Sequence, residues 1–138
     1  VPSMGQFMLS GKLRSYSNEV VASVVLARSE AIKRNQTVRV CVANEDGDDC
    51  ASGSWENGWI VITTADEVLH RQQPITDGFK ILSAVDELAF QSSGVGATQA
   101  VFKVCRATPS VGNQEREVSV SATGRTSVDK PAASGSCS

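Results

Sequence analysis

Residues 41–50, "CVANEDGDDC", hold the side chains that are most able to do chemistry in this chain. Two cysteines enclose one Glu, three Asp and one Gly, so the stretch could bind a cation, act as a redox pair or form a disulfide across a turn. A calcium-binding EF-hand loop has Gly at its sixth position and Glu at its twelfth, whereas Gly47 is the fourth residue counted from Asn44 and no Glu stands twelfth. Asn, Asp and Gly are typical turn residues, so we interpret the stretch as the tip of a hairpin and expect no metal or cofactor there.

The cysteines predict a compartment. The chain has four of them, Cys41, Cys50, Cys105 and Cys137, and His70 is its single histidine. No CxxC pair occurs, so the short ligand spacings of a structural zinc site are missing. An even number of cysteines instead predicts two disulfides in an oxidising compartment, which means the periplasm, the cell surface or secretion. Four cysteines allow three pairings, and the sequence does not select one. A Cys41–Cys50 disulfide would close a small loop across the hairpin and stabilise the fold by about 2–3 kcal/mol.

The sequence does not predict an enzyme, and we expect no small-molecule substrate. A Ser/His/Asp site would depend on His70, which lies in an apparent strand, and no serine stands in a nucleophile elbow. Asp48 and Asp49, like Asp86 and Glu87, are adjacent, and neighbouring residues of a strand point to opposite faces. The "GVG" of "SSGVGATQ" lacks the third glycine and the following helix of a dinucleotide fingerprint.

The overall charge argues against a strongly basic nucleic-acid-binding protein. The 138 residues suffice for one domain, and their formal net charge is -2. Arg125 and Lys130, near the C-terminus, are candidate DNA contacts, although one arginine does not make a phosphate clamp. No run of about 18 apolar residues is present, so we expect no membrane span within these residues.

Residues 1–36 are predicted to form one long amphipathic helix. Apolar residues recur at steps of three and four, which places them on one stripe of a helix. The stripe consists of Leu9, Leu13, Tyr16, Val20, Val24, Ala27 and Ala31, and Val21, Val25 and Ile32 widen it toward one side. A helix this long needs a broad surface to pack against.

Residues 37–124 are predicted to supply that surface as a β-sheet. The stretch "TVRVCVA" alternates between two faces, and "WIVITT", "VLHRQQ", "FKIL", "LAF", "AVFKVC" and "REVSVSA" follow as short strands bounded by turn residues. Such spacings leave no room for crossover helices, so we expect an antiparallel meander packed on the helix, which is an α+β fold in one domain. Residues 125–138, rich in small and polar residues, are expected to form a C-terminal tail.

The chain resembles a known family over almost its whole length. The stretches "LARSEAIKRNQTVRVCVANEDGDDC", "WENGWIVI", "LAFQSSGVG", "FKVC" and "REVSVSATGR" occur in the order typical of the GspH/FimT family of minor pilins and pseudopilins, which are components of type IV pili and type II secretion systems. The resemblance implies the type IV pilin-like fold, a long N-terminal helix on an antiparallel sheet. It also implies a leader peptide and an apolar anchor in the inner membrane, and "VPSM" is similar to the point just past that anchor. We therefore expect these residues to be the soluble head of a single-pass protein, periplasmic at first and extracellular once in the pilus.

The function implied by the resemblance is structural. Such a subunit joins other minor pilins and the major pilin, primes assembly and lies near the pilus tip. FimT-like members instead bind DNA during uptake, through a C-terminal pattern like G-R-x-R. Here Gly124-Arg125-Thr126-Ser127 lacks the second arginine, which favours a FimU-like structural subunit. A GspH-like pseudopilin of a secretion system is the third alternative.

Roles for particular residues follow from the same resemblance. Pairing Cys105 with Cys137 would hold the tail on the sheet. We expect Leu9, Leu13 and Tyr16 to extend beyond the sheet and contact neighbouring subunits in the filament. The lower stripe residues are expected to be buried inside the domain, and these are Val20, Val24, Ala27 and Ala31.

Overall fold

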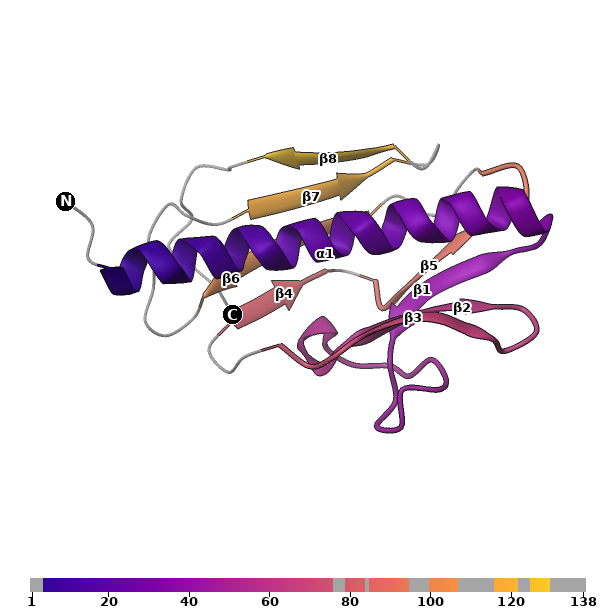
Figure 1. Cartoon of the computed structure of the whole chain (residues 1–138), viewed down its shortest axis with the longest axis horizontal. Helices are drawn as coiled ribbons and strands as arrows, with labels where there is room; N and C mark the ends of the chain where they lie inside the picture. The colour runs from indigo at the N-terminus through magenta and orange to yellow at the C-terminus, as the bar shows by residue number, and fades with distance from the viewer. Residues whose placement is uncertain are drawn as a thin grey trace.

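One helix lies across two antiparallel sheets in the computed structural model (Figure 1). The structure describes residues 4–75, 79–83, 85–94, 100–106, 116–121 and 125–129, and of residues 4–10, 106 and 129 only the backbone. The helix is α1 (Met4–Arg34). The strands and the short 3-10 helix η1 are β1 (Val38–Val42), η1 (Trp55–Asn57), β2 (Trp59–Thr63), β3 (Val68–Gln72), β4 (Phe79–Leu82), β5 (Glu87–Phe90), β6 (Ala100–Arg106), β7 (Arg116–Val120) and β8 (Thr126–Asp129). The predicted α+β fold, a long N-terminal helix packed on antiparallel β-structure, is confirmed.

The strands are not connected as one continuous meander. The first sheet has the order β3-β2-β1-β5, and the second has the order β4-β6-β7-β8. β5 returns to the edge of β1, with Leu88 opposite Val40, while β4 joins β6 instead of β3. Alternation within a four-residue segment identifies a strand but not the strand that it pairs with. The sequence therefore did not predict that β5 joins the first sheet and β4 the second. Residues 126–129, which we expected in the C-terminal tail, form the edge strand β8.

The helix ends where its backbone turns left-handed. Asn35 has φ 53°, and its N–H donates to the carbonyl of Ile32 while the N–H of Gln36 donates to that of Ala31. This is the Schellman arrangement, which satisfies carbonyls left without partners at a helix end. Lys33 and Arg34 in the last turn add favourable charge at the negative end of the helix dipole. The chain therefore leaves α1 in a fixed direction and enters β1 within four residues.

The core lies between α1 and both sheets. The predicted lower stripe of Val20, Val24, Ala27 and Ala31 is buried, as expected. Trp59 is fully buried, and its indole N–H donates to the hydroxyl of Ser23, a buried polar residue of α1, over 2.8 Å. This bond satisfies both groups and fixes the position of the helix along the sheet.

Candidate functional site

The acidic hairpin tip is held by a disulfide. Cys41 and Cys50 are bonded, with their Cα atoms 5.5 Å apart, so the first pairing considered above is present. The loop is also closed by its own hydrogen bonds: the amide of Asn44 donates to Asp48 over 2.8 Å, and the Asp48 N–H donates back to the Asn44 side chain over 3.1 Å. Gly47 has φ 70°, the left-handed region that favours glycine. Asn44, Gly47 and Asp48 therefore act as turn residues in this loop, as the sequence predicted.

The loop carboxylates do not converge. Glu45, Asp46, Asp48 and Asp49 are all exposed, and two of them accept hydrogen bonds within the loop. Across the described residues, no group of three or more His, Cys, Asp or Glu side chains is arranged to hold a metal ion. The four acids form an exposed negative surface instead.

Only one cysteine of the second predicted pair lies within the described residues. Cys105 lies in β6, is fully buried and is disulfide-bonded. Cys137 lies outside the described residues. The Cys105–Cys137 pairing therefore stays a prediction.

The predicted filament contacts on α1 need one correction. Leu13 has no exposed surface, because it packs into the core with the lower stripe, so the expectation that it extends beyond the sheet is wrong. Tyr16 is half-buried, and its ring meets that of Phe79 edge-on at 5.3 Å. The side chain of Leu9 lies outside the described residues. The sheet thus reaches further along the helix than the stripe alone indicates.

Another face of α1 carries the exposed apolar side chains. Val25 and Ile32 are 50% and 48% exposed, seven residues apart, and hence lie on nearly the same side of the helix. The sequence placed them at the side of the buried stripe, but the helix turns them away from the core. Arg28, between them, donates from Nε to the carbonyl of Gly94 over 3.0 Å, which ties this face to the turn after β5.

Arg125 lies at the base of the β7–β8 connection. Its N–H donates to the Ser121 hydroxyl, and its carbonyl accepts from the Ser121 N–H over 2.9 Å. The exposed side chain borders a shallow hollow of about 300 Å³ with Val101, Ser119 and Ser127. Lys130 lies outside the described residues. Within the part of the chain that is described, Arg125 is the only basic residue at this hollow.

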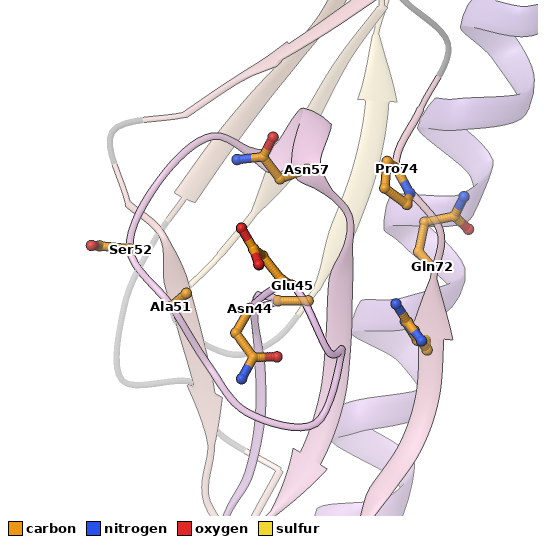
Figure 2. A pocket seen from close by; sticks show the side chains of 9 residues that line it. Asn44, Glu45, Ala51, Ser52, Asn57, Gln72 and Pro74 are labelled. Atoms are coloured by element: carbon orange, nitrogen blue, oxygen red, sulfur yellow. The ribbon is translucent and has the colours of Figure 1, made fainter.

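A larger cleft lies beside the disulfide loop, and sequence reasoning missed it (Figure 2). Its volume is about 570 Å³. One wall, the loop wall, consists of residues 43–45, 51 and 52, and the other, the strand wall, of residues 71, 72 and 74 at the end of β3. Asn57 of η1 lies at one end, and Glu45 points into the space between the walls (Figure 2). Its polar lining consists of Asn44, Glu45, Ser52, Asn57, Arg71 and Gln72.

Arg71 lies against the loop, and none of the described acids pairs with it. Its guanidinium lies over Gly47, where a Cβ atom would overlap it. No carboxylate of the described residues lies within ion-pair distance of Arg71, although Arg34 and Arg39 are both paired. The acidic loop could be identified in the sequence. Its contact with the end of β3 could not, because that contact depends on the β2–β3 register.

Among the described residues, no helix combines the length and the apolar composition that a membrane span requires. A family model described as type II transport protein GspH matches residues 17–124. Comparison with curated proteins finds no match.

Two solved structures share the fold. The type IV minor pilin FimU of Pseudomonas aeruginosa is similar with a TM-score of 0.66 and 21% sequence identity, covering 84% of this chain and 91% of the FimU chain in that structure. The minor pseudopilin EpsH of the Vibrio cholerae type II secretion system is similar with a TM-score of 0.65 and 14% identity, covering 91% of this chain and 99% of the EpsH chain in that structure. These likenesses show one long helix on antiparallel sheets in all three proteins.

Proposed function

The chain belongs to the GspH family and has the fold of type IV minor pilins and pseudopilins, and from this premise we propose that it is a structural subunit that joins other minor pilins to prime assembly of a type IV pilus. Its place is near the pilus tip, and its partners are other minor pilins and the major pilin. The head lies in the periplasm while the protein is anchored in the inner membrane, and outside the cell once it enters the pilus. The disulfides support an oxidising compartment.

The observation that carries the proposal is the second apolar face of α1. The helix buries one stripe in its own head, while Val25 and Ile32 remain about half exposed on a face that the described sheets do not cover. Apolar side chains at such spacing on a helix suit a second helix that packs alongside. A filament subunit needs two apolar helix faces, because one packs against the sheets of its own head and the other packs against a neighbouring subunit.

Direct binding tests this proposal. We expect the purified protein to bind at least one purified minor-pilin head encoded in the same genome. Val25→Glu with Ile32→Glu should reduce pilus number in cells that lack the native gene, since two charges would enter the helix contact. Wild-type protein that binds none of the heads would count against the assembly role.

The matched control places the same two charges elsewhere on the helix. Ser15 and Ala22 are small, exposed residues of α1 with the same seven-residue spacing. They lie roughly 70° around the helix from Val25, at about 3.6 residues per turn. Ser15→Glu with Ala22→Glu should therefore leave pilus number near that of wild type. An equal loss of pili in both double variants would mean that added charge, and not the apolar face, causes the defect.

A DNA-binding minor pilin is the second candidate, and Arg125 is the observation that favours it. The side chain is exposed beside serine hydroxyls, and no described residue pairs with it. A mobility shift that weakens with salt and is lost in Arg125→Ala would establish this function, because phosphate contacts release counterions. We rank it second because one arginine supplies few phosphate contacts. The pseudopilin alternative shares the fold, so detection of the protein in secretion or in pilus fractions distinguishes those two machines.

A further inference from the structure

We propose that the cleft between the loop wall and the strand wall binds an extended polar segment of a partner pilin subunit, and that this segment carries a carboxylate for Arg71. The inference rests on the proposed function, because it names the surface by which one class of partner is recognised. It concerns a different face of the molecule from the apolar side of α1.

Arg71 is the anchor of this site. It is exposed, no described acid pairs with it, and Gly47 leaves room for the guanidinium to lie against the loop backbone. A guanidinium without such a partner can donate two parallel hydrogen bonds to a carboxylate. Another exposed arginine close to the first sheet, Arg34, already has two acidic partners and offers no such capacity.

The remaining polar groups suit a peptide. The exposed side-chain amide of Asn57 offers a donor and an acceptor, and these match the C=O and N–H of an extended chain. Gln72 adds its amide oxygen as an acceptor, while its Nε2 donates to the Gln73 carbonyl over 3.3 Å. Glu45 contributes the opposite charge to Arg71, so a segment with an acid and a donor in the correct order is favoured over a uniformly acidic one.

The charge around the cleft disfavours nucleic acid as the occupant. Asp46, Asp48 and Asp49 are exposed on the same loop as Glu45. Four carboxylates within five residues repel every phosphate of a nucleic acid, whereas a partner segment brings a single carboxylate, which the Arg71 guanidinium attracts.

Both walls are fixed before any partner arrives. The Cys41–Cys50 disulfide closes the loop wall, and the Ala43 N–H donates to the Gly58 carbonyl over 3.0 Å. Just beyond the strand wall, the Ile75 N–H donates to the Glu56 carbonyl over 3.1 Å. η1 and the turn after it therefore tie the two walls together, so little ordering is needed on binding.

The test measures binding of purified minor-pilin heads from the same genome to this protein and to its variants. Arg71→Glu should weaken binding of the recognised head about tenfold or more, and Glu45→Gln by a smaller factor. Arg125→Glu makes the same charge change on the other sheet, and its affinity for the head should stay within about twofold of the wild-type affinity. Circular dichroism and the melting temperature check that each variant is folded, and Arg71→Met, which keeps the apolar stem, provides a milder second variant.

Each result has a distinct meaning. Equal binding by wild type and Arg71→Glu overturns the cleft proposal and leaves the assembly role intact. Failure of the wild-type protein to bind any of the heads overturns both. Concentration-dependent self-association that is lost in Arg71→Glu would identify a second copy of this chain as the occupant, and thus overturn the choice of a different subunit. In ¹⁵N-labelled protein, the expected partner shifts the side-chain amide signals of Asn57 and Gln72.

Discussion

Arg71 at the end of β3 and Arg125 just before β8 are both exposed and have no described acidic partner, but their surroundings differ. Arg71 lies in a cleft of about 570 Å³, with amides and a carboxylate on walls held by a disulfide and backbone hydrogen bonds. Arg125 borders a shallow hollow of about 300 Å³ lined mainly by serines, small residues and the exposed Val101.

The comparison separates two kinds of recognition. A walled cleft with mixed charge can fix the order and orientation of a peptide. An open surface with one cation can attract phosphate but sets little geometry. The same residue type therefore suits the proposed protein partner at one site of the head, whereas at the other it offers one charge for a polyanion.

The largest effect is expected from the disulfide of the second sheet. If Cys105 pairs with Cys137, the bond closes a loop of roughly 30 residues, and replacing both cysteines with alanine should lower the free energy of unfolding by about 3–4 kcal/mol. Peptide mapping of the unreduced protein checks the pairing, and urea denaturation measures the loss. A map that joins Cys105 to anything other than Cys137 would show that the predicted pairing is wrong.

The disulfide of the first sheet should matter less for stability and more for binding. Cys41→Ala with Cys50→Ala opens a loop whose ends are nine residues apart, and should cost about 2–3 kcal/mol. Because the same bond holds the loop wall, partner affinity should fall even at temperatures where the double variant is fully folded. Loss of stability with unchanged affinity would mean that the loop wall does not depend on the disulfide.

Gly47 allows Arg71 to be moved without removing it. A Cβ at this position would overlap the guanidinium, and φ 70° is costly for alanine, so Gly47→Ala should lower the free energy of unfolding by about 1–2 kcal/mol and displace Arg71. Thermal denaturation measures the first effect and partner binding the second. Gly11→Ala is the control: nothing lies within 4 Å of its added Cβ, and alanine should stabilise the helix slightly. Unchanged partner affinity in Gly47→Ala would argue that the position of Arg71 is unimportant.

The fold was largely predictable because its signals are local. The stripe of α1 follows from steps of three and four, and its lower part, Val20 to Ala31, is buried as predicted. The prediction was wrong for Leu13, because periodicity shows which side of a helix is apolar but not how far a sheet extends along it. The exchange of β4 and β5 between sheets was missed for a similar reason, since pairing is decided between segments distant in sequence.

The candidate site was predictable in part. "CVANEDGDDC" identified the disulfide loop and its turn chemistry, both of which the structure contains. Arg71 carried no signal, since a lone arginine in "VLHRQQ" is ordinary on a strand. It becomes notable only because the pairing of β2 with β3 brings it over Gly47. The rest of the disulfide loop, η1 and β2 separate these two residues along the chain, so no local pattern can express their contact.

The smallest effect is expected from replacing Arg34. Unlike Arg71 and Arg125, this arginine has acidic partners within the described residues, so it serves as the paired case in the comparison. It lies 2.7 Å from Glu30 and 3.1 Å from Glu67, joining the end of α1 to the β2–β3 turn. The hydrogen bond from Arg34 lowers the pKa of the Glu30 carboxyl, and the bond to Glu30 raises the pKa of the guanidinium. A carboxyl whose pKa is lowered on folding stabilises the protein above its unfolded pKa, and this stabilisation is lost as the pH falls through the folded value.

We therefore expect Arg34→Gln to lower the melting temperature slightly near neutral pH, and the difference from wild type to shrink as the pH drops below about 4. Arg14→Gln, on the same helix and exposed, is the control and should show no such dependence on pH. The measurement is thermal denaturation across a pH series at low ionic strength, since salt screens exposed pairs. Because Arg34 already donates its hydrogen bonds to two acids of its own chain, the variant should leave partner affinity unchanged. An Arg34→Gln protein that lost its partner as fully as Arg71→Glu would show that an unpaired guanidinium is not what distinguishes the cleft.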